Sequence, residues 1–321
     1  MLGISLWASP PPLAWWPPDA VWAVDFAQRR AMLAGVPADF ASSFGIARAG
    51  GKLVRNGQGR FETVGANTAS LTEAGLLVED AGSNLCTYAA DPSQAAWFRN
   101  SITLASGLAD PAGADGAWLI TETGSGAALS RQPMSITQGA TYSLTRIVRR
   151  GNFDWMRVTV GDASFISATL CWYNLASATA GSVSQTAGGF GHLSQKIEQL
   201  ADGYIAITQS FVAPGTQLNI SLTSAAADGS TTRADLGAGA GMGGQYGHWM
   251  TQLEVGAASS LMVSGAAPAS RPAEQLVLPD APTSGTLTAV FSDGTSQSLS
   301  LAAPLPASFA KPVIARLVAT P

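Results

Sequence analysis

The sequence predicts an all-β protein: an antiparallel β-sandwich of the jelly-roll type, with a small N-terminal attachment region and a C-terminal β-hairpin region. Apolar and polar residues alternate with a period of two in many short segments, as they do in half-buried strands. Turn signals with Gly, Asn, Asp or Pro separate these segments, and no long stretch has a helical period. Charged residues make up only 12% of the 321, roughly half the usual share. Such a composition favours short strands, many turns and large subunit interfaces.

The order of these segments divides the chain into three regions. Residues 1–80 form an N-terminal attachment arm and a small β region, residues 81–272 form the sandwich, and residues 273–321 form a small C-terminal β region. Pro and Trp dominate residues 1–20, which excludes a helix or a central strand there. Because exposed Trp clusters are costly in water, we expect this arm to dock on another subunit, or else on its own domain.

Short elements are expected in the N-terminal region. The pair Asn56-Gly57 predicts a hairpin turn between strands at 52–55 and 60–64. Residues 27–33 fit one short helix, and residues 76–78 fit a brief apolar strand. These elements are too short to form a large core by themselves.

The C-terminal region predicts a hairpin and one further strand. Residues 257–284 are rich in small residues and Pro and are expected to be a linker, while 285–302 predict a hairpin around Asp293-Gly294. A final strand is expected at 313–318. A piece of this size has little stability alone, so we expect it to pack on the sandwich or on another chain.

Alternation assigns a core face to several sandwich strands. Met156, Val158 and Val160 are expected to face the core, which places Trp155 and Arg157 outside. The same argument assigns to core faces Tyr142, Leu144, Val148, Leu218, Ile220, Leu222, Trp249, Leu253 and Val255, and we also place Trp172 in the core.

From residue 44 onward, a series of short motifs resembles a segment common in phage tail-fibre and head-spike proteins. The series consists of GLLVE at 75–79, SNL at 83–85, AAW at 95–97, GATYSL at 139–144, WMRV at 155–158, WYNL at 172–175, DGY at 202–204 and WMTQLE at 249–254. Each motif alone is weak, but their order over residues 44–272 is fairly specific. Arg146 departs from the pattern at a position that is usually apolar, and residues 1–43 and 273–321 match nothing in it.

The resemblance implies a carbohydrate-binding-module-like jelly roll on the virion surface of a tailed phage or a phage-derived gene transfer agent. It implies a spike or fibre that binds host cell-surface polysaccharide and promotes adsorption. By the same analogy, we expect a homotrimer that contacts other virion proteins of the spike base, capsid or tail. The alternative is a structural decoration or assembly protein of the particle without ligand binding.

The N-terminus and the overall charge exclude several other classes. No Lys or Arg precedes Arg29, and Pro17, Pro18 and Asp19 interrupt the first apolar run, so we expect no signal peptide and no spanning helix. The protein is therefore expected to be made in the host cytoplasm. A net charge of −4 without a basic patch argues against a nucleic-acid partner.

Sugar binding by a β-sandwich needs aromatic rings that stack on pyranose rings and planar polar groups that bind hydroxyls in pairs. Trp155 and Arg157 would supply both from one strand face. The glycan-binding residues that we predict are Trp155, Arg157, Tyr173, Arg149, His248 and Gln252. Three alternatives remain: a Trp in a sandwich is often a core residue, Arg157 can pair with a carboxylate, and a strand's faces can be inverted.

Catalytic and metal-binding patterns are missing from the sequence, so we expect no enzymatic activity and no cofactor. Glycoside hydrolysis needs two carboxylates about 5–9.5 Å apart, and no motif specifies such a pair among Asp154, Asp162, Glu198 and Glu254. A calcium ion remains an alternative without a specifying pattern, in loops that contain Asp110, Asp115 and Asp228. The two cysteines, Cys86 and Cys171, either form a disulfide or remain buried thiols.

Overall fold

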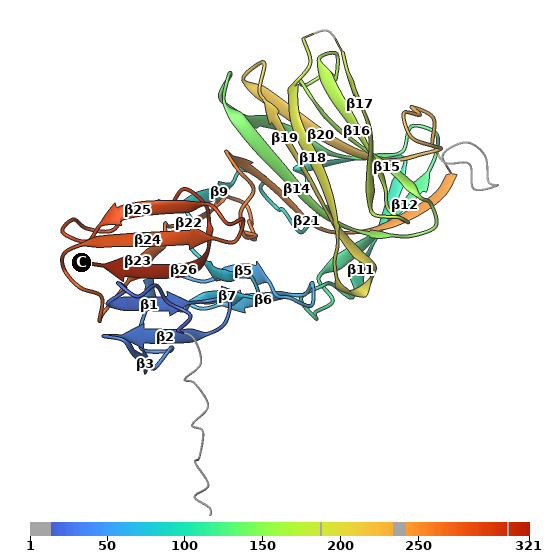
Figure 1. The fold of residues 1–321 in the computed structure, drawn as a ribbon. Helices are drawn as coiled ribbons and strands as arrows, with labels where there is room; N and C mark the ends of the chain where they lie inside the picture. Colours follow the sequence, from blue (N-terminus) through green and yellow to red (C-terminus); the bar gives the residue numbers. More distant parts are fainter. Residues whose placement is uncertain (1–13, 187, 234–241, 307) are drawn as a thin grey trace, which may run out of the picture. The chain divides into compact units, whose positions relative to one another are not determined.

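The structure, a computed structural model, describes residues 14–186, 188–233, 242–306 and 308–321, and these residues are mostly in antiparallel strands (Figure 1). The prediction of an all-β, sandwich-type fold is thus confirmed. The chain forms two compact units. The first contains 14–48, Asn67–Asp80 and Ala273–Pro321, and the second contains Ala49–Ala66 and Ala81–Pro272. Within the described residues, we find no helix long and apolar enough to cross a membrane.

The main sheet of the first unit joins N-terminal and C-terminal strands of the chain (Figure 1). Its strands run in the order β25-β24-β26-β1-β2-β3, and β8 pairs with both β26 and β7. A separate pair, β4 with β23, belongs to the same unit. The strands are β1 (Trp22–Asp25), β2 (Arg30–Leu33), β3 (Val36–Ala38), β4 (Gly45–Ala47), β7 (Ser70–Thr72), β8 (Gly75–Leu77), β23 (Gln275–Val277), β24 (Thr286–Phe291), β25 (Ser296–Ser300) and β26 (Val313–Thr320).

The C-terminal hairpin and final strand, β24, β25 and β26, form where the sequence predicts them. They do not stand alone, because β26 also pairs with β1, from Arg316 to Ala319. An isolated hairpin is only marginally stable in water, and three or more strands with an apolar face are needed for stability. The N-terminal strands supply the missing neighbours. The expected linker at 257–284 also contains two short strands, β22 (Ala269–Arg271) and β23.

The helix expected at 27–33 is wrong, since β2 begins at Arg30 and pairs with β1. A tight turn joins the two strands: the Asp25 carboxylate accepts the Gln28 N–H at 3.0 Å, and Arg29 adopts a φ of +52°. A carboxylate that bonds to a nearby backbone N–H favours a turn over a helix. The apolar spacing of so short a segment does not distinguish these outcomes.

The predicted docking arm lies partly outside the described residues, which start at residue 14. In the described part, Trp15 and Trp16 are partly buried and pack against a small cluster that includes Ala23, Met32 and Val318. This part of the arm therefore packs on its own unit.

A buried ion pair links segments of the first unit close to the positions where the chain passes from one unit to the other. Arg48 donates to the Glu274 carboxylate, and both side chains are fully buried. The second oxygen of Glu274 accepts the backbone N–H of Glu79 at 2.9 Å. Arg48, Glu79 and Glu274 all lie within two residues of a boundary between the units. One carboxylate thus joins the three chain segments of this unit.

The second unit contains two six-stranded antiparallel sheets (Figure 1). One sheet has the order β10-β13-β20-β15-β16-β17 and is called the groove sheet, because a surface groove lies on it. The other has the order β11-β12-β21-β14-β19-β18 and is called the bulge sheet, because β21 contains a β-bulge. The strands of the groove sheet are β10 (Trp97–Asn100), β13 (Ala128–Ser135), β15 (Trp155–Gly161), β16 (Ala168–Asn174), β17 (Thr179–Gln185) and β20 (Gln217–Ala225). Those of the bulge sheet are β11 (Ile102–Leu108), β12 (Ala117–Thr123), β14 (Thr141–Arg150), β18 (Gly191–Gln199), β19 (Tyr204–Val212) and β21 (Met242–Val255).

Apolar residues from both sheets form one core. Met156, Val158 and Val160 of β15 lie in it, as do Leu144 and Val148 of β14, and all are fully buried. The core faces predicted for Leu218, Ile220 and Leu222 are also confirmed. Cys86 and Cys171 are buried free thiols.

A β-bulge in β21 changes its alternation. Ile147 pairs with Met250 but Val148 pairs with His248, so Trp249 is the extra residue. A bulge of this kind shifts all later side chains to the opposite face. Leu253 therefore lies in the central core while Trp249 lies in a second cluster, with Phe61 and Met250. The prediction that Trp249 and Leu253 share a face is wrong for this reason.

Shorter elements complete the second unit. They are the hairpin β5 (Lys52–Arg55) and β6 (Phe61–Val64), the pair β9 (Gly82–Asn84) and β22, and a 3₁₀ turn η1 (Ala201–Gly203). The hairpin around Asn56-Gly57 is confirmed. Its residue Phe61 packs at 5.1 Å between ring centres on Trp249, so this layer covers the outer face of the bulge sheet.

Candidate functional site

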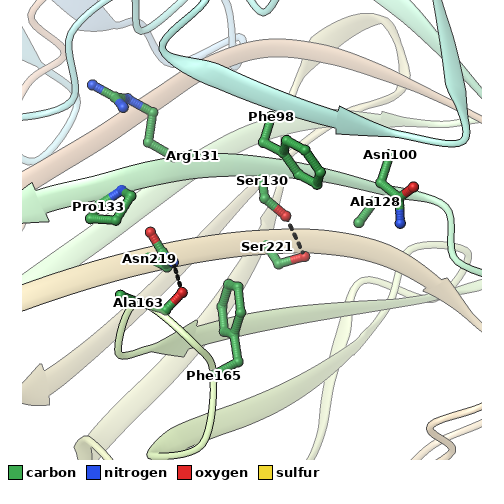
Figure 2. A pocket seen from close by; sticks show the side chains of 10 residues that line it. All are labelled: Phe98, Asn100, Ala128, Ser130, Arg131, Pro133, Ala163, Phe165, Asn219 and Ser221. Atoms are coloured by element: carbon green, nitrogen blue, oxygen red, sulfur yellow. Dashed lines mark hydrogen bonds between the residues drawn. The ribbon is translucent and has the colours of Figure 1, made fainter.

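A groove with a volume of about 460 Å³ lies on the outer face of the groove sheet (Figure 2). It is lined by Phe98, Asn100, Ala128, Ser130, Arg131, Pro133, Ala163, Phe165, Asn219 and Ser221. Most of these residues come from β10, β13 and β20, and the rest come from the loop between β15 and β16. The groove thus combines neighbouring strands with one loop, as ligand sites on sandwiches often do.

Strand alternation explains why these side chains share a face. Trp97 and Leu129 are fully buried in the core, so their neighbours Phe98 and Ser130 point away from it. Phe98 pairs with Ser130, and Ser130 pairs with Ser221. Residues directly opposite one another in a ladder lie on the same face. Phe98 is 57% exposed, which is unusual for a large aromatic side chain and marks this face as a candidate binding surface.

The two phenylalanines lie on either side of the Ser130–Ser221 pair (Figure 2). Ser130 donates its hydroxyl to Ser221 at 3.0 Å, which leaves the hydrogen of the Ser221 hydroxyl for another acceptor. The floor of the groove therefore offers hydroxyl groups between two aromatic rings.

Phe165 reaches the groove from a tightly held turn. It has a φ of +58°, a conformation that is rare for a bulky residue and is found at strained, functional positions. The Asp162 carboxylate accepts the N–H groups of Ser164 and Ile166, both at 3.0 Å, and of Ser167 at 3.1 Å. These bonds compensate the strain and hold Phe165 in place.

The hydrogen bonds of this turn also stabilise the charged form of Asp162. Burial by itself would raise the pKa of Asp162, but the N–H groups of Ser167, Ser164 and Ile166 stabilise the carboxylate, so its pKa lies below its ordinary value. Gly161 is needed next to it, because a Cβ there would lie 2.7 Å from the Phe165 ring.

Asn219 connects the turn to the sheet. Its side-chain amide donates to the Ala163 carbonyl at 2.8 Å (Figure 2). Its Oδ1 atom is buried and has no hydrogen-bond partner among the described residues. Since buried polar atoms in proteins are generally paired with protein or water, this oxygen is an unpaired acceptor in a residue that lines the groove.

Trp155 and Arg157 lie on the outer face of the groove sheet, opposite the core residues of β15, as the sequence predicts. Neither lines the groove. Both are half-buried: the Arg157 guanidinium donates to the Thr231 carbonyl at 3.3 Å, and the Trp155 ring packs over Gly181. Burial and then the nearby Arg233 lower the pKa of Arg157. Their role in binding stays a prediction.

The prediction that Tyr173 binds a glycan at the surface is wrong. It pairs with Met156 and is fully buried in the core. Its hydroxyl donates to Gln209 Oε1 at 3.4 Å, and burial raises its pKa well above the ordinary value. Trp172 is the residue of β16 that faces outward, although it is buried, with its indole N–H donating to the Ser230 carbonyl at 2.8 Å. The faces of β16 are thus inverted relative to the prediction.

The prediction that His248 and Gln252 contact a glycan at the surface is also wrong, for a different reason in each case. The bulge at Trp249 turns His248 into the core, where it is fully buried. Gln252 does face outward, but the following loop covers it: its Oε1 accepts the Met262 N–H at 2.7 Å, and its Nε2 donates to Glu254 at 2.8 Å. Neither side chain can reach a ligand at the surface.

Arg149 lies on the outer face of the bulge sheet, whereas the groove lies on the groove sheet. It is half-buried, and its guanidinium carbon lies 6.0 Å from the centre of the Tyr204 ring. The six predicted residues are therefore not brought together into one site.

A second cluster of polar side chains is enclosed between the sheets. Arg146 is fully buried and donates to Thr251 Oγ1 at 2.9 Å, while its Nε and Nη2 atoms have no partner among the described residues. Burial lowers its pKa to about 10. Both ring nitrogens of His248 and the hydroxyl of Tyr246 are likewise unpaired in the described structure. These side chains are fully buried, whereas the groove lies at the surface, so the groove is the better candidate site.

Carboxylates are used elsewhere in the fold. None of Asp154, Asp162, Glu198 and Glu254 lines the groove. Asp110 accepts the N–H groups of Ala112, Ala114 and Gly116, and Asp228 accepts from Ser182. Over the described part of the chain, no group of three His, Cys, Asp or Glu is arranged to hold a metal ion.

Phe98 and Phe165 are not among the residues that the sequence predicts for the site. Phe98 carries a usable signal, since it directly follows Trp97 and a strand cannot bury two successive side chains on one face. Phe165 carries none, because its role depends on the turn that Asp162 holds. Compared with known proteins, the chain matches no family model and no curated protein.

Proposed function

We propose that this protein is a non-enzymatic glycan-binding protein, and that it acts as a spike or fibre on the surface of a phage-type particle, binding host cell-surface polysaccharide to promote adsorption. The observation that carries the binding part is the groove with Phe98 and Phe165 on either side of a hydroxyl- and amide-containing floor. Aromatic faces stack on the apolar side of a pyranose ring, and hydroxyl and amide groups hydrogen-bond to its hydroxyls.

The place on a particle rests on the motif series between residues 75 and 254. A groove of this size buries only a few sugar units, so the affinity of one site is expected to be modest. Many copies on one particle raise the overall avidity without new contacts. A homotrimer that attaches to other virion proteins would provide such copies.

Direct binding tests the groove. Purified protein is titrated with polysaccharide isolated from candidate host cells, and the variants Phe98→Ala and Phe165→Ala are compared with Ile166→Ala. Ile166 is 73% exposed and does not line the groove, so it controls for the loss of an exposed apolar side chain from the same turn. Loss of binding in the two Phe variants alone supports the proposal, whereas equal binding by all proteins contradicts it.

Particle adsorption tests the biological role. Particles with and without the protein are compared for binding to host cells, with purified host polysaccharide as competitor. Reduced adsorption of intact particles, with competition by the polysaccharide, supports the spike or fibre role. Unstable or misassembled particles would instead favour a structural decoration or assembly protein without ligand binding.

A further inference from the structure

We infer that the groove accepts an uncharged segment of polysaccharide, with a pyranose ring between Phe98 and Phe165, and that it discriminates against acidic glycans; this inference rests on the glycan-binding function proposed above. The charge of the side chains around the groove decides whether a ligand carboxylate can be bound there.

None of the described lining residues directs an ionisable side chain into the groove. Arg131 is the only charged residue among them, and its guanidinium makes its hydrogen bonds on the other side of the sheet. It donates to the Ala96 carbonyl at 2.8 Å and to Thr87 Oγ1 at 2.6 Å. Figure 2 shows its side chain pointing away from the other lining residues. The described lining therefore offers no cation to a bound carboxylate or sulfate.

An acidic sugar in this groove would lose hydration without gaining an ionic partner. Burying a charged group is unfavourable unless it is paired and hydrogen-bonded, and proteins that recognise carboxylates use Arg or Lys for this purpose. The nearest fixed charge on the turn is negative, because Asp162 directly precedes Ala163 and the hydrogen bonds to its carboxylate keep it ionised. A second negative charge on the ligand would be repelled.

The polar groups of the lining suit neutral hydroxyls. Ser221 can donate a hydroxyl hydrogen, and Asn219 Oδ1 is an unpaired acceptor within the described structure. Phe98 and Phe165 have no polar atoms, so they contact only the C–H faces of a ring. A hexose or 6-deoxyhexose without an acidic group presents this combination of apolar faces and hydroxyl edges.

The test uses the full-length protein and two panels of soluble polysaccharides. One panel is neutral (dextran, galactan, mannan and neutral host polysaccharide), and the other is acidic (alginate, polygalacturonate, hyaluronan and acidic host polysaccharide). Binding is measured by affinity electrophoresis and calorimetry. We expect at least one neutral polymer to bind, with affinity reduced by about tenfold or more in Phe98→Ala and Phe165→Ala and unchanged in Ile166→Ala. We also expect little change in affinity between about 50 mM and about 500 mM NaCl, since no ion pair is formed.

A charge-introducing variant tests the stated reason. Ala128 lines the groove from β13 and has no side-chain hydrogen bond to lose. Ala128→Lys is expected to allow salt-sensitive binding of an acidic polymer that the wild type does not bind. Phe98-dependent binding of an acidic polymer by the wild type would overturn the inference while leaving the glycan-binding function intact. A lack of binding to every polymer in both panels would instead count against the proposed function.

Discussion

The guanidinium carbon of Arg146 lies 5.5 Å from the centre of the Trp97 indole ring, inside the sandwich. Trp97 also contacts the His248 ring, with 5.5 Å between ring centres. A cation and an imidazole are thus held against one aromatic ring, and all three side chains are buried. The ring face attracts the cation, but buried N–H groups without acceptors are costly in such surroundings. This balance leads to predictions that do not depend on the groove.

Replacing Arg146 with Met should leave the protein as stable or make it more stable. The guanidinium makes one hydrogen bond to Thr251, and its Nε and Nη2 atoms are unpaired in the described structure. Replacing a whole buried ion pair by apolar residues of similar volume is often neutral or stabilising by about 1–4 kcal/mol. Met also removes the cost of burying a guanidinium with unpaired N–H groups. Urea unfolding measures the change. Arg146→Ala, which leaves a cavity, serves as the comparison and should be less stable than Arg146→Met. A large destabilisation by Met would show that the guanidinium has a partner that offsets its burial.

The stability of the protein should fall in mild acid because of His248. Burial, and next the positive charge of Arg146, lowers the pKa of His248 to about 3, compared with about 6.5 in the unfolded chain. Between these values the unfolded state binds a proton that the native state does not, so the free energy of unfolding decreases as the pH falls. The decrease approaches about 1.4 kcal/mol per pH unit.

The measurement compares His248→Gln with the wild type by urea unfolding at several pH values. Between about pH 6.5 and about pH 4.5 the wild type should lose roughly 2–3 kcal/mol more than the variant. His192→Gln is the control, since burial lowers the pKa of His192 as well, but this residue is only partly buried. Identical pH profiles of the wild type and His248→Gln would show that His248 titrates normally.

The first unit should depend strongly on the ion pair between Arg48 and Glu274. Glu274→Gln removes the charge that neutralises a fully buried guanidinium. Leaving one member of a buried pair without its counter-charge costs about 3–5 kcal/mol. Lys311→Gln is the matched control, because its ion pair with Asp293 spans 3.6 Å at the surface and should contribute less than about 1 kcal/mol. Thermal unfolding of the two variants is measured by calorimetry. Equally small losses of stability in both variants would contradict the prediction.

Asp162 should act as a positioning residue for the groove. Asp162→Ala removes the acceptor of three backbone N–H groups, so the turn can relax and Phe165 can leave its strained φ. We expect glycan affinity to fall by about tenfold while the unfolding temperature changes little. Asp228→Ala provides a matched control, because Asp228 holds a turn through Ser182 and does not line the groove. If both variants bind equally well, the turn does not control the groove.

Local sequence patterns were sufficient to predict the strands and several faces. The alternation at 156–160 identified the core side of β15, and the turn signals at Asn56-Gly57 and Asp293-Gly294 identified two hairpins. These features depend on neighbouring residues and on a period that every strand shares. The same patterns could not reveal the bulge at Trp249, because one extra residue in a ladder is defined only by the strand opposite it.

Tertiary structure alone decided which surface is available for binding. Phe98 and Phe165 come from distant parts of the chain and meet because β10, β13, β20 and β15 are neighbours in one sheet. Gln252 faces outward, but a ligand cannot contact its side chain because the following loop covers the strand. Alternation is a local property, so the amino-acid sequence was enough to predict that the chain forms strands with two different faces. The neighbours of each strand, and therefore the groove, were decided by long-range pairing and burial, which no local pattern encodes.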